Sequence, residues 1–280
     1  MPKLIDIHCH VDERGFANDW KEVIQKTLDQ DIWLVNIGAD LETSRHSVKT
    51  TGIFPEGVFA SVGIHPTHED NISEADWEEI KLLAKNEKVV TIGECGLEYF
   101  QSITNYELRV TNEERDRITN ERKEEQKKLF RKHIELAIEV DKPLMVHCRP
   151  SKGSQDAYLD AIEMLLEYKK EYGERVRANF HFFAGNLETA KKCIELGFTL
   201  SFTGVITFAN QYDEVIKWLP ADRIVAETDA PFVAPIPFRS KRCEPAYVEY
   251  VVRKMAELRG ISYEEMAVLT VENARKFFRL

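Results

Sequence analysis

The chain has 280 residues, of which 43% are hydrophobic and 31% charged, and this composition excludes a disordered protein and is typical of a globular enzyme. Its formal net charge of -10 excludes proteins that bind nucleic acid through a broadly basic surface. The first residues, MPKLIDIHCH, do not resemble a signal peptide, and no apolar run approaches the roughly 20 residues that span a bilayer. The five cysteines form no CxxC pair, so we expect reduced thiols, a soluble protein and a cytoplasmic location.

Short apolar runs alternate with amphipathic stretches along the whole chain. The runs that we expect to form strands are 3–10, 33–38, 58–66, 89–97, 143–149, 177–185, 198–204 and 223–232. Helical spacing of apolar residues follows at 20–30, 76–86, 131–140, 159–172, 187–197 and 212–219, with two further helices at 244–259 and 263–278. Eight strand–helix repeats predict a parallel α/β fold, a (β/α)8 TIM barrel that occupies residues 1–280 as one domain.

One step between strand ends is longer than the others. Successive ends near residues 8, 37, 65 and 94 are separated by about 29 residues, whereas the step from 94 to 147 is about 24 residues longer. We interpret residues 101–125, which are polar and rich in both charge signs, as an insertion after strand 4. A solvated helical extension is the simpler interpretation, and a substrate-contacting lid is the alternative, because the loops after barrel strands border the active site.

Residues able to bind metal stand at the ends of several predicted strands. His8 and His10 are two positions apart in the first strand, so both imidazoles point to the same side and can converge on one ion. This pair alone is weak evidence. Five strands together supply six such residues near their carboxyl ends, where barrel active sites are built. The predicted ligands are His8, His10, Glu94, His147, His181 and Asp229.

Six nitrogen and oxygen ligands are more than one catalytic ion requires. A carboxylate such as Glu94 can bridge two cations, which predicts a site for two divalent metal ions; zinc, manganese and magnesium all remain open. Asp229, in the segment ETDAPF, is suited both to bind one ion and to accept the proton of the attacking water. Glu94 and Asp229 are therefore the predicted catalytic residues.

The motifs DIHCH, VGIHP, IGECGLEYF, HCR, HFFAG, ETDAPF, PFRSKRCEP and ENARKFF follow one another over almost the whole chain. As an ordered set they resemble the TatD-type metal-dependent hydrolases of the amidohydrolase-like superfamily. The resemblance implies a phosphodiesterase or deoxyribonuclease with the six ligands named above. It also implies that His8, His10 and Asp229 hold one ion, that His147 and His181 hold the other, and that Glu94 bridges them.

The resemblance makes His65, Arg239 and Arg149 candidates for substrate binding. The alternatives are that His65 supports a metal ligand or lies in the core, and that Arg239 is a surface arginine. The chain departs from the family pattern at Glu98 and Phe100, where aspartate and tyrosine are common, and at Ala184 and Cys243, where serine and asparagine are common. None of these four is expected to touch a metal ligand, so the departures concern substrate choice.

The leading hypothesis is a two-metal deoxyribonuclease, similar to a 3'-5' exonuclease, which acts on DNA or another phosphodiester as a monomer or weak oligomer without membrane contact. One alternative is hydrolysis of an amide, cyclic amide or ester. Two-metal enzymes of that kind often carry a carbamylated lysine where this chain has Glu94, which favours phosphoesters. A metal-binding scaffold without catalysis is a third possibility.

Overall fold

The computed structural model describes residues 1–100 and 112–280. Within these residues, eight parallel strands form one sheet in which each strand pairs with its neighbour in the chain. They are β1 (Leu4–Cys9), β2 (Ile32–Ile37), β3 (Val58–Val62), β4 (Val89–Glu98), β5 (Leu144–Arg149), β6 (Ala178–Phe180), β7 (Thr199–Phe202) and β8 (Ile224–Ala226). The end of β8 returns to β1, where the Asp229 amide donates a 2.9 Å hydrogen bond to the His8 carbonyl. The eight predicted strands and the (β/α)8 barrel are confirmed.

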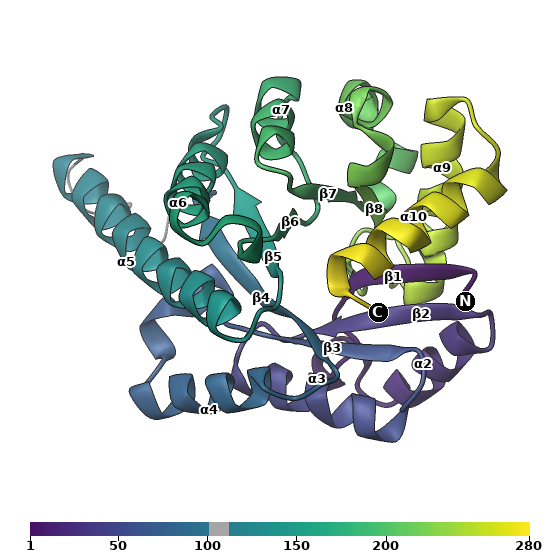
Figure 1. Ribbon diagram of the computed structural model, residues 1–280, viewed down its shortest axis with the longest axis horizontal. Helices are drawn as coiled ribbons and strands as arrows, with labels where there is room; N and C mark the ends of the chain where they lie inside the picture. The colour runs from purple at the N-terminus through teal and green to yellow at the C-terminus, as the bar shows by residue number, and fades with distance from the viewer. Residues whose placement is uncertain (101–111) are drawn as a thin grey trace.

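The described helices lie around the strands, most of them on the outside of the barrel (Figure 1). In chain order they are α1 (Glu13–Phe16), α2 (Trp20–Leu28), α3 (Leu41–Ile53), α4 (Glu74–Ala84), α5 (Asn112–Glu139), α6 (Asp156–Tyr172), α7 (Leu187–Glu195), α8 (Asp213–Trp218), α9 (Val248–Arg259) and α10 (Tyr263–Phe278). Among the described residues, no helix is both long and apolar enough to cross a membrane.

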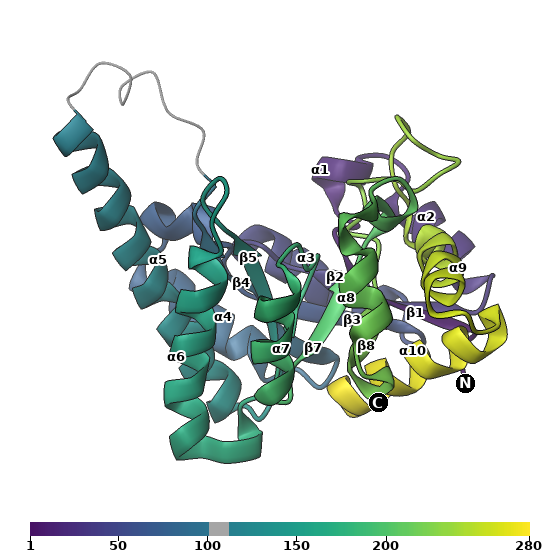
Figure 2. The same cartoon turned by 90° about the horizontal axis from the view of Figure 1, so that it is seen from above.

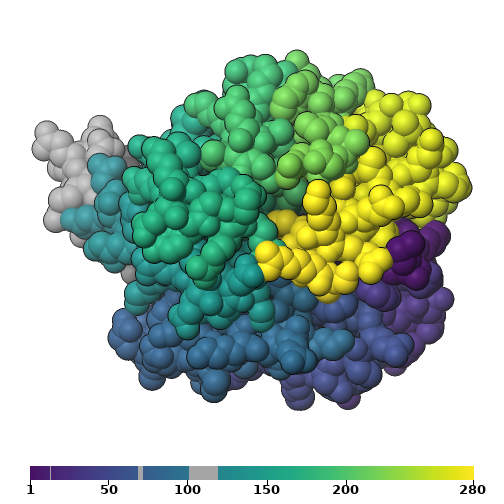
Figure 3. Space-filling model, in the orientation of Figure 1, coloured from purple at the N-terminus to yellow at the C-terminus, as the bar shows by residue number. Residues whose placement is uncertain are grey.

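The last helix, α10, closes one end of the barrel. Its apolar residues Val271, Ala274 and Phe277 pack against inward-facing side chains of the strands, such as Ile5 and Val225, in one buried cluster. In the space-filling view the C-terminal segment lies against the N-terminal segment on this face (Figure 3). Apolar side chains thus fill this end of the barrel, and the predicted metal ligands stand at the opposite end, where the strands have their carboxyl ends.

Helix α3 lies outside the helical patterns identified in the sequence, because its buried side is not apolar. That side consists of small hydroxyl side chains, among them Ser44, Ser47 and Thr50. The helix begins with a capping box, in which Asp40 accepts a hydrogen bond from the Thr43 amide and Thr43 accepts one from the Asp40 amide. Hydrophobic periodicity cannot reveal a helix of this kind.

The predicted insertion at 101–125 is only partly described. Residues 101–111 lie outside the described residues, and from Asn112 onward the chain is helical as α5, which runs to Glu139. This long helix extends outward past its neighbours (Figure 2). The C-terminal part of the predicted insertion is therefore the beginning of the helix that leads to β5.

A buried histidine joins α5 to the segment that follows β3. His133 is fully buried, and its Nε2 accepts a 3.0 Å hydrogen bond from the Ile64 amide while Nδ1 faces the Leu129 carbonyl at 2.9 Å. Burial lowers the pKa of His133 to about 4, so the imidazole is neutral in the folded protein.

Because His133 is buried in its neutral form, we expect it to lower the stability of the folded protein in acid. In the unfolded chain His133 takes up a proton near pH 6.5, whereas the folded protein resists it down to about pH 4, so stability falls as the pH drops through this window. The expected contribution is about 3 kcal/mol. Urea unfolding at pH 6.5, 5 and 4 should show a smaller fall for His133→Gln than for the wild type. An equal fall in the free energy of unfolding of both proteins would contradict a neutral, buried His133.

Candidate metal centre

All six predicted ligands lie at the same end of the barrel, around a cavity of about 880 Å3. His8 is in β1 and His10 directly follows it, Glu94 is in β4, His147 is in β5, His181 directly follows β6, and Asp229 follows β8. Five of the six line the cavity, and the sixth, His8, is fully buried behind them. Residues from five different strands therefore meet at one place, as expected from their positions at strand ends.

One group of donor atoms surrounds the imidazoles of the first strand. The Nε2 atoms of His8 and His10 are 3.1 Å apart. Oδ1 of Asp229 lies 3.6 Å from His8 Nε2 and 3.5 Å from His10 Nε2. Oε2 of Glu94 lies 3.7 and 3.3 Å from the same two nitrogens. Two nitrogens and two carboxylate oxygens thus face a common point.

A second group forms around the other oxygen of Glu94. Its Oε1 lies 2.9 Å from Nδ1 of His147 and 2.8 Å from Nε2 of His181, and these two nitrogens are 3.3 Å apart. Nε2 of His65 is 3.6 Å from the same oxygen. Glu94 therefore presents one carboxylate oxygen to each group, which is the geometry of a bridging carboxylate.

Two glycines allow β4 to present Glu94 in this way. Gly93 and Gly96 have φ of +144° and +138°, a region that side chains rarely adopt. A Cβ atom at Gly96 would collide with the His147 carbonyl, so the glycine also permits the close approach of β4 to β5. The backbone of Glu94 is held from the other side, where its amide donates a 2.9 Å hydrogen bond to the Gly38 carbonyl.

The electrostatics of the first group favour a cation. Nδ1 of His10 faces the Ile37 carbonyl at 3.2 Å, so a neutral ring carries its proton there and turns a lone pair at Nε2 toward the cavity. Burial opposes a charge on His10, but Asp229 and Glu94 outweigh it and raise the pKa of His10 to about 10. Burial also opposes ionisation of Glu94, yet the surrounding histidines hold its pKa well below the usual range. Positive charge is thus stabilised at this point, and the donors suit a divalent ion such as zinc or manganese.

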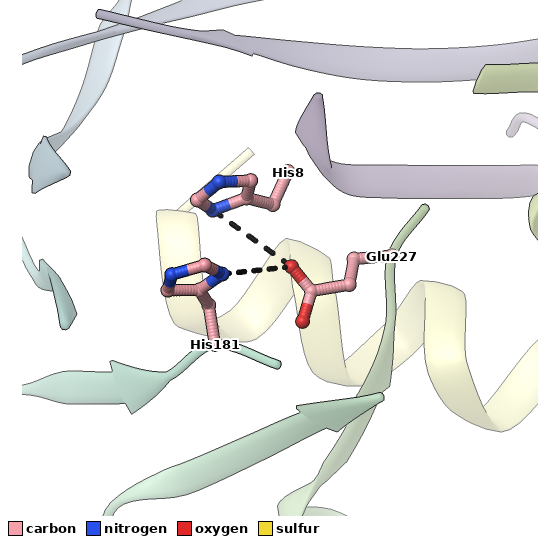
Figure 4. Close-up of side chains that lie close together, drawn as sticks. All are labelled: His8, His181 and Glu227. Carbon is pink, nitrogen blue, oxygen red and sulfur yellow. Dashed lines mark ion pairs between the residues drawn. The ribbon is translucent and has the colours of Figure 1, made fainter. Parts of the chain in front are cut away.

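Two carboxylates that the sequence analysis did not select as ligands lie next to the histidines: Glu227 behind the cavity wall, and Glu98 in the wall itself. His8 and His181 are stacked, with ring centroids 3.9 Å apart, and both direct Nδ1 to Oε2 of Glu227, at 3.8 and 3.5 Å (Figure 4). Glu98 Oε2 lies 3.1 Å from Nε2 of His147, the nitrogen remote from Glu94. The Glu98–His147 contact is a hydrogen bond, whereas Oε2 of Glu227 and the two Nδ1 atoms that face it form none in this structure. A carboxylate that accepts from a ligating histidine fixes its tautomer and raises its basicity.

The expectation that the substitution at Glu98 touches no ligand is wrong. Because β4 continues to Glu98 beside β5, its side chain reaches His147 on the neighbouring strand. Glu227 carried a signal that the sequence analysis did not use. It stands two residues before Asp229 and directly after the buried residues of β8, and it is fully buried itself.

The three predicted substrate-binding residues have different surroundings. His65 lines the cavity, and burial lowers its pKa to about 3. Arg149 also lines the cavity, with its guanidinium 4.4 Å from the ring centroid of Phe100. Arg239 is not among the residues that line the cavity, and it stacks on Phe208 at 3.7 Å. The structure therefore brings His65 and Arg149, but not Arg239, to the cavity wall.

The chain is similar to known proteins along almost its whole length. A family model described as TatD related DNase matches residues 5–279. The chain is 36% identical over 280 residues to the uncharacterized metal-dependent hydrolase YabD of Bacillus subtilis, covering 99% of each chain. It is 27% identical over 285 residues to a Pantoea vagans protein named 3'-5' ssDNA/RNA exonuclease TatD, covering 99% of this chain and 100% of that one.

Among solved structures, that of YjjV, a TatD homologue from Escherichia coli, superposes with a TM-score of 0.83. Its sequence is 23% identical, and the match covers 99% of this chain and 98% of that one, so this similarity concerns the fold. The family model, by contrast, matches almost every residue of the sequence, and the Bacillus relative is similar along its full length. The chain therefore belongs to the TatD family of metal-dependent hydrolases.

Proposed function

We propose that this hydrolase cleaves phosphodiester bonds with two divalent cations, as a deoxyribonuclease that removes nucleotides from a 3' end. The observation that carries the proposal is the position of Glu94. Its two oxygens face two separate groups of donors, and these are the ligands predicted for the two ions. Cations bound at these donors would lower the pKa of a bound water and stabilise negative charge on the oxygens of the phosphoryl group.

The protein side chains have distinct tasks in this proposal. Asp229 accepts the proton of the attacking water, because its carboxylate borders both the cavity and the first donor group. Glu227 and Glu98 favour neutral histidines with the proton on the nitrogen that faces away from Glu94, so that the opposite nitrogens offer lone pairs to the ions.

His65 is placed to donate a hydrogen bond to the substrate. Its Nδ1 accepts a 3.2 Å hydrogen bond from the Thr67 amide, so in the neutral ring the proton is on Nε2. That nitrogen is near Glu94 and borders the cavity. A neutral donor here can hold a phosphate oxygen or the leaving oxygen. Arg149 supplies a positive charge at the same wall, and Arg239 remains a predicted phosphate contact farther out.

Phosphodiesters are favoured over amides for two reasons. The bridging position on β4 is held by Glu94 rather than by a lysine. The Pantoea relative carries the name of a single-strand exonuclease. An amide or cyclic amide substrate is the alternative that an activity test must exclude.

The test is a substrate panel with defined metal content. Protein stripped with a chelator should hydrolyse nothing, and manganese, zinc or magnesium should restore cleavage of bis-p-nitrophenyl phosphate and of single-stranded oligonucleotides. Oligonucleotides labelled at the 5' end should shorten one nucleotide at a time. Hydrolysis of a cyclic amide or ester without any phosphodiester cleavage would refute the proposal and support the alternative.

A further inference from the structure

An exposed aromatic ring stands directly beside the metal centre. The side chain of Phe232 is 57% exposed and lines the cavity three residues after Asp229. Its ring centroid is 6.3 Å from that of His10. An exposed phenylalanine is unremarkable on most surfaces, but here it lies within one side-chain length of the proposed ligands.

The backbone that carries this ring is held in place. The Phe232 amide donates a 2.9 Å hydrogen bond to the Asp229 carbonyl, and the Pro231 carbonyl accepts a 3.0 Å hydrogen bond from the Cys243 amide. Pro231 also packs closely against Gly15, where a Cβ atom would lie 2.8 Å from the proline ring. An aromatic side chain on such a backbone has only two rotatable bonds, so it binds a flat ligand at little cost in conformational entropy.

Phe182 and Arg149 line the same space, and Phe100 stacks on Arg149 outside the cavity lining. Phe182, which directly follows His181, lines the cavity, and its amide is bound by Glu227. Phe100 is 44% exposed and stacks with Arg149, whose guanidinium forms no ion pair with any residue that the structure describes. Aromatic faces next to a cationic group are the features with which proteins bind single-stranded nucleic acid.

We infer that Phe232 stacks on the base of the terminal nucleotide and thereby selects unpaired ends, with the Phe100–Arg149 pair contacting the strand farther along. This inference rests on the proposed function. A terminal base in a duplex is already paired and stacked on its neighbour, so it must be released before it can reach Phe232. The chain's net charge of -10 is consistent with recognition of a short end by stacking rather than with binding along a duplex.

The experiment compares two single-stranded oligonucleotides that differ only at the 3'-terminal residue, which carries a base in one and is abasic in the other. The wild type should cleave the first with a kcat/KM about ten- to a hundredfold higher, as expected for one base–aromatic contact. Phe232→Leu should abolish this preference by slowing only the substrate with the base, and Phe232→Trp should retain it.

The matched control is Trp218→Leu, which removes an exposed aromatic ring on α8 outside the cavity lining and should leave the preference unchanged. Thermal melting of each variant checks that it is folded. Equal cleavage of both oligonucleotides by the wild type, or an unchanged preference in Phe232→Leu, would overturn the inference and leave the proposed function intact. Cleavage of neither oligonucleotide with any of the three cations would overturn both.

Discussion

Replacing Asp229 by asparagine is expected to lower kcat for phosphodiester hydrolysis by about 10³-fold, within the range by which positioned acid–base groups accelerate reactions. Asparagine keeps the shape of the side chain and one oxygen, but it lacks the negative charge and cannot accept the proton of the attacking water. The Oδ1 atom of Asp229 lies 3.6 and 3.5 Å from Nε2 of His8 and His10, so the loss of charge falls within the first donor group.

Two measurements separate the consequences of this change. Single-turnover kinetics with saturating manganese report the chemical step, and mass spectrometry of the bound metal reports occupancy. Asp222→Asn is the matched control, because this carboxylate precedes the same strand, β8, and pairs with Arg223 away from the cavity. The control should behave as the wild type. Asp229→Asn protein with wild-type kcat would refute the role proposed for this residue.

Glu227→Gln is expected to weaken metal binding or activity by about 10- to 100-fold, although Glu227 does not line the cavity. The carboxylate only accepts hydrogen bonds, and both stacked histidines direct Nδ1 to its Oε2 atom. A glutamine amide that offers N–H to Nδ1 would favour the tautomer with the proton on Nε2. The lone pairs that His8 and His181 turn toward the cavity would then be lost.

Metal titrations followed by activity distinguish this effect from unfolding. The variant should need a higher metal concentration and should approach the wild-type rate when the metal is raised. Glu195→Gln, at an exposed position at the end of α7, is the control and should bind metal as the wild type does. Unaltered metal affinity in Glu227→Gln would show that metal binding by His8 and His181 does not depend on this carboxylate.

The order of the barrel could be predicted because each strand is a short buried run followed by an amphipathic helix. The exception is α3, which shows that a helix can be recognised from hydrophobic periodicity only when its buried side is apolar. The buried hydroxyl of Ser44 donates a hydrogen bond to the Gly63 carbonyl, and that of Ser47 donates one to the Asn36 carbonyl. The helix therefore packs against the barrel without an apolar face. A pattern of hydrophobicity contains no information about such packing.

The sequence by itself determined the barrel and the set of residues that gather at its carboxyl end. Ligand-type residues at strand ends can be recognised one strand at a time, since all parallel strands of a barrel end on the same face. This local rule was sufficient to predict which residues meet at that face: His8, His10, Glu94, His147, His181 and Asp229.

Only the tertiary structure decided which atom faces which. The assignment of one Glu94 oxygen to each donor group, and the contacts of Glu98 and Glu227 with the histidines, depend on distances between strands that are far apart in the chain. The same holds for Arg239, which stacks on Phe208 instead of lining the cavity, and for Phe232, which does line it. These distances arise from barrel closure and strand register, which bring β8 to β1 and β4 to β5, and residue spacing along a single chain does not contain them.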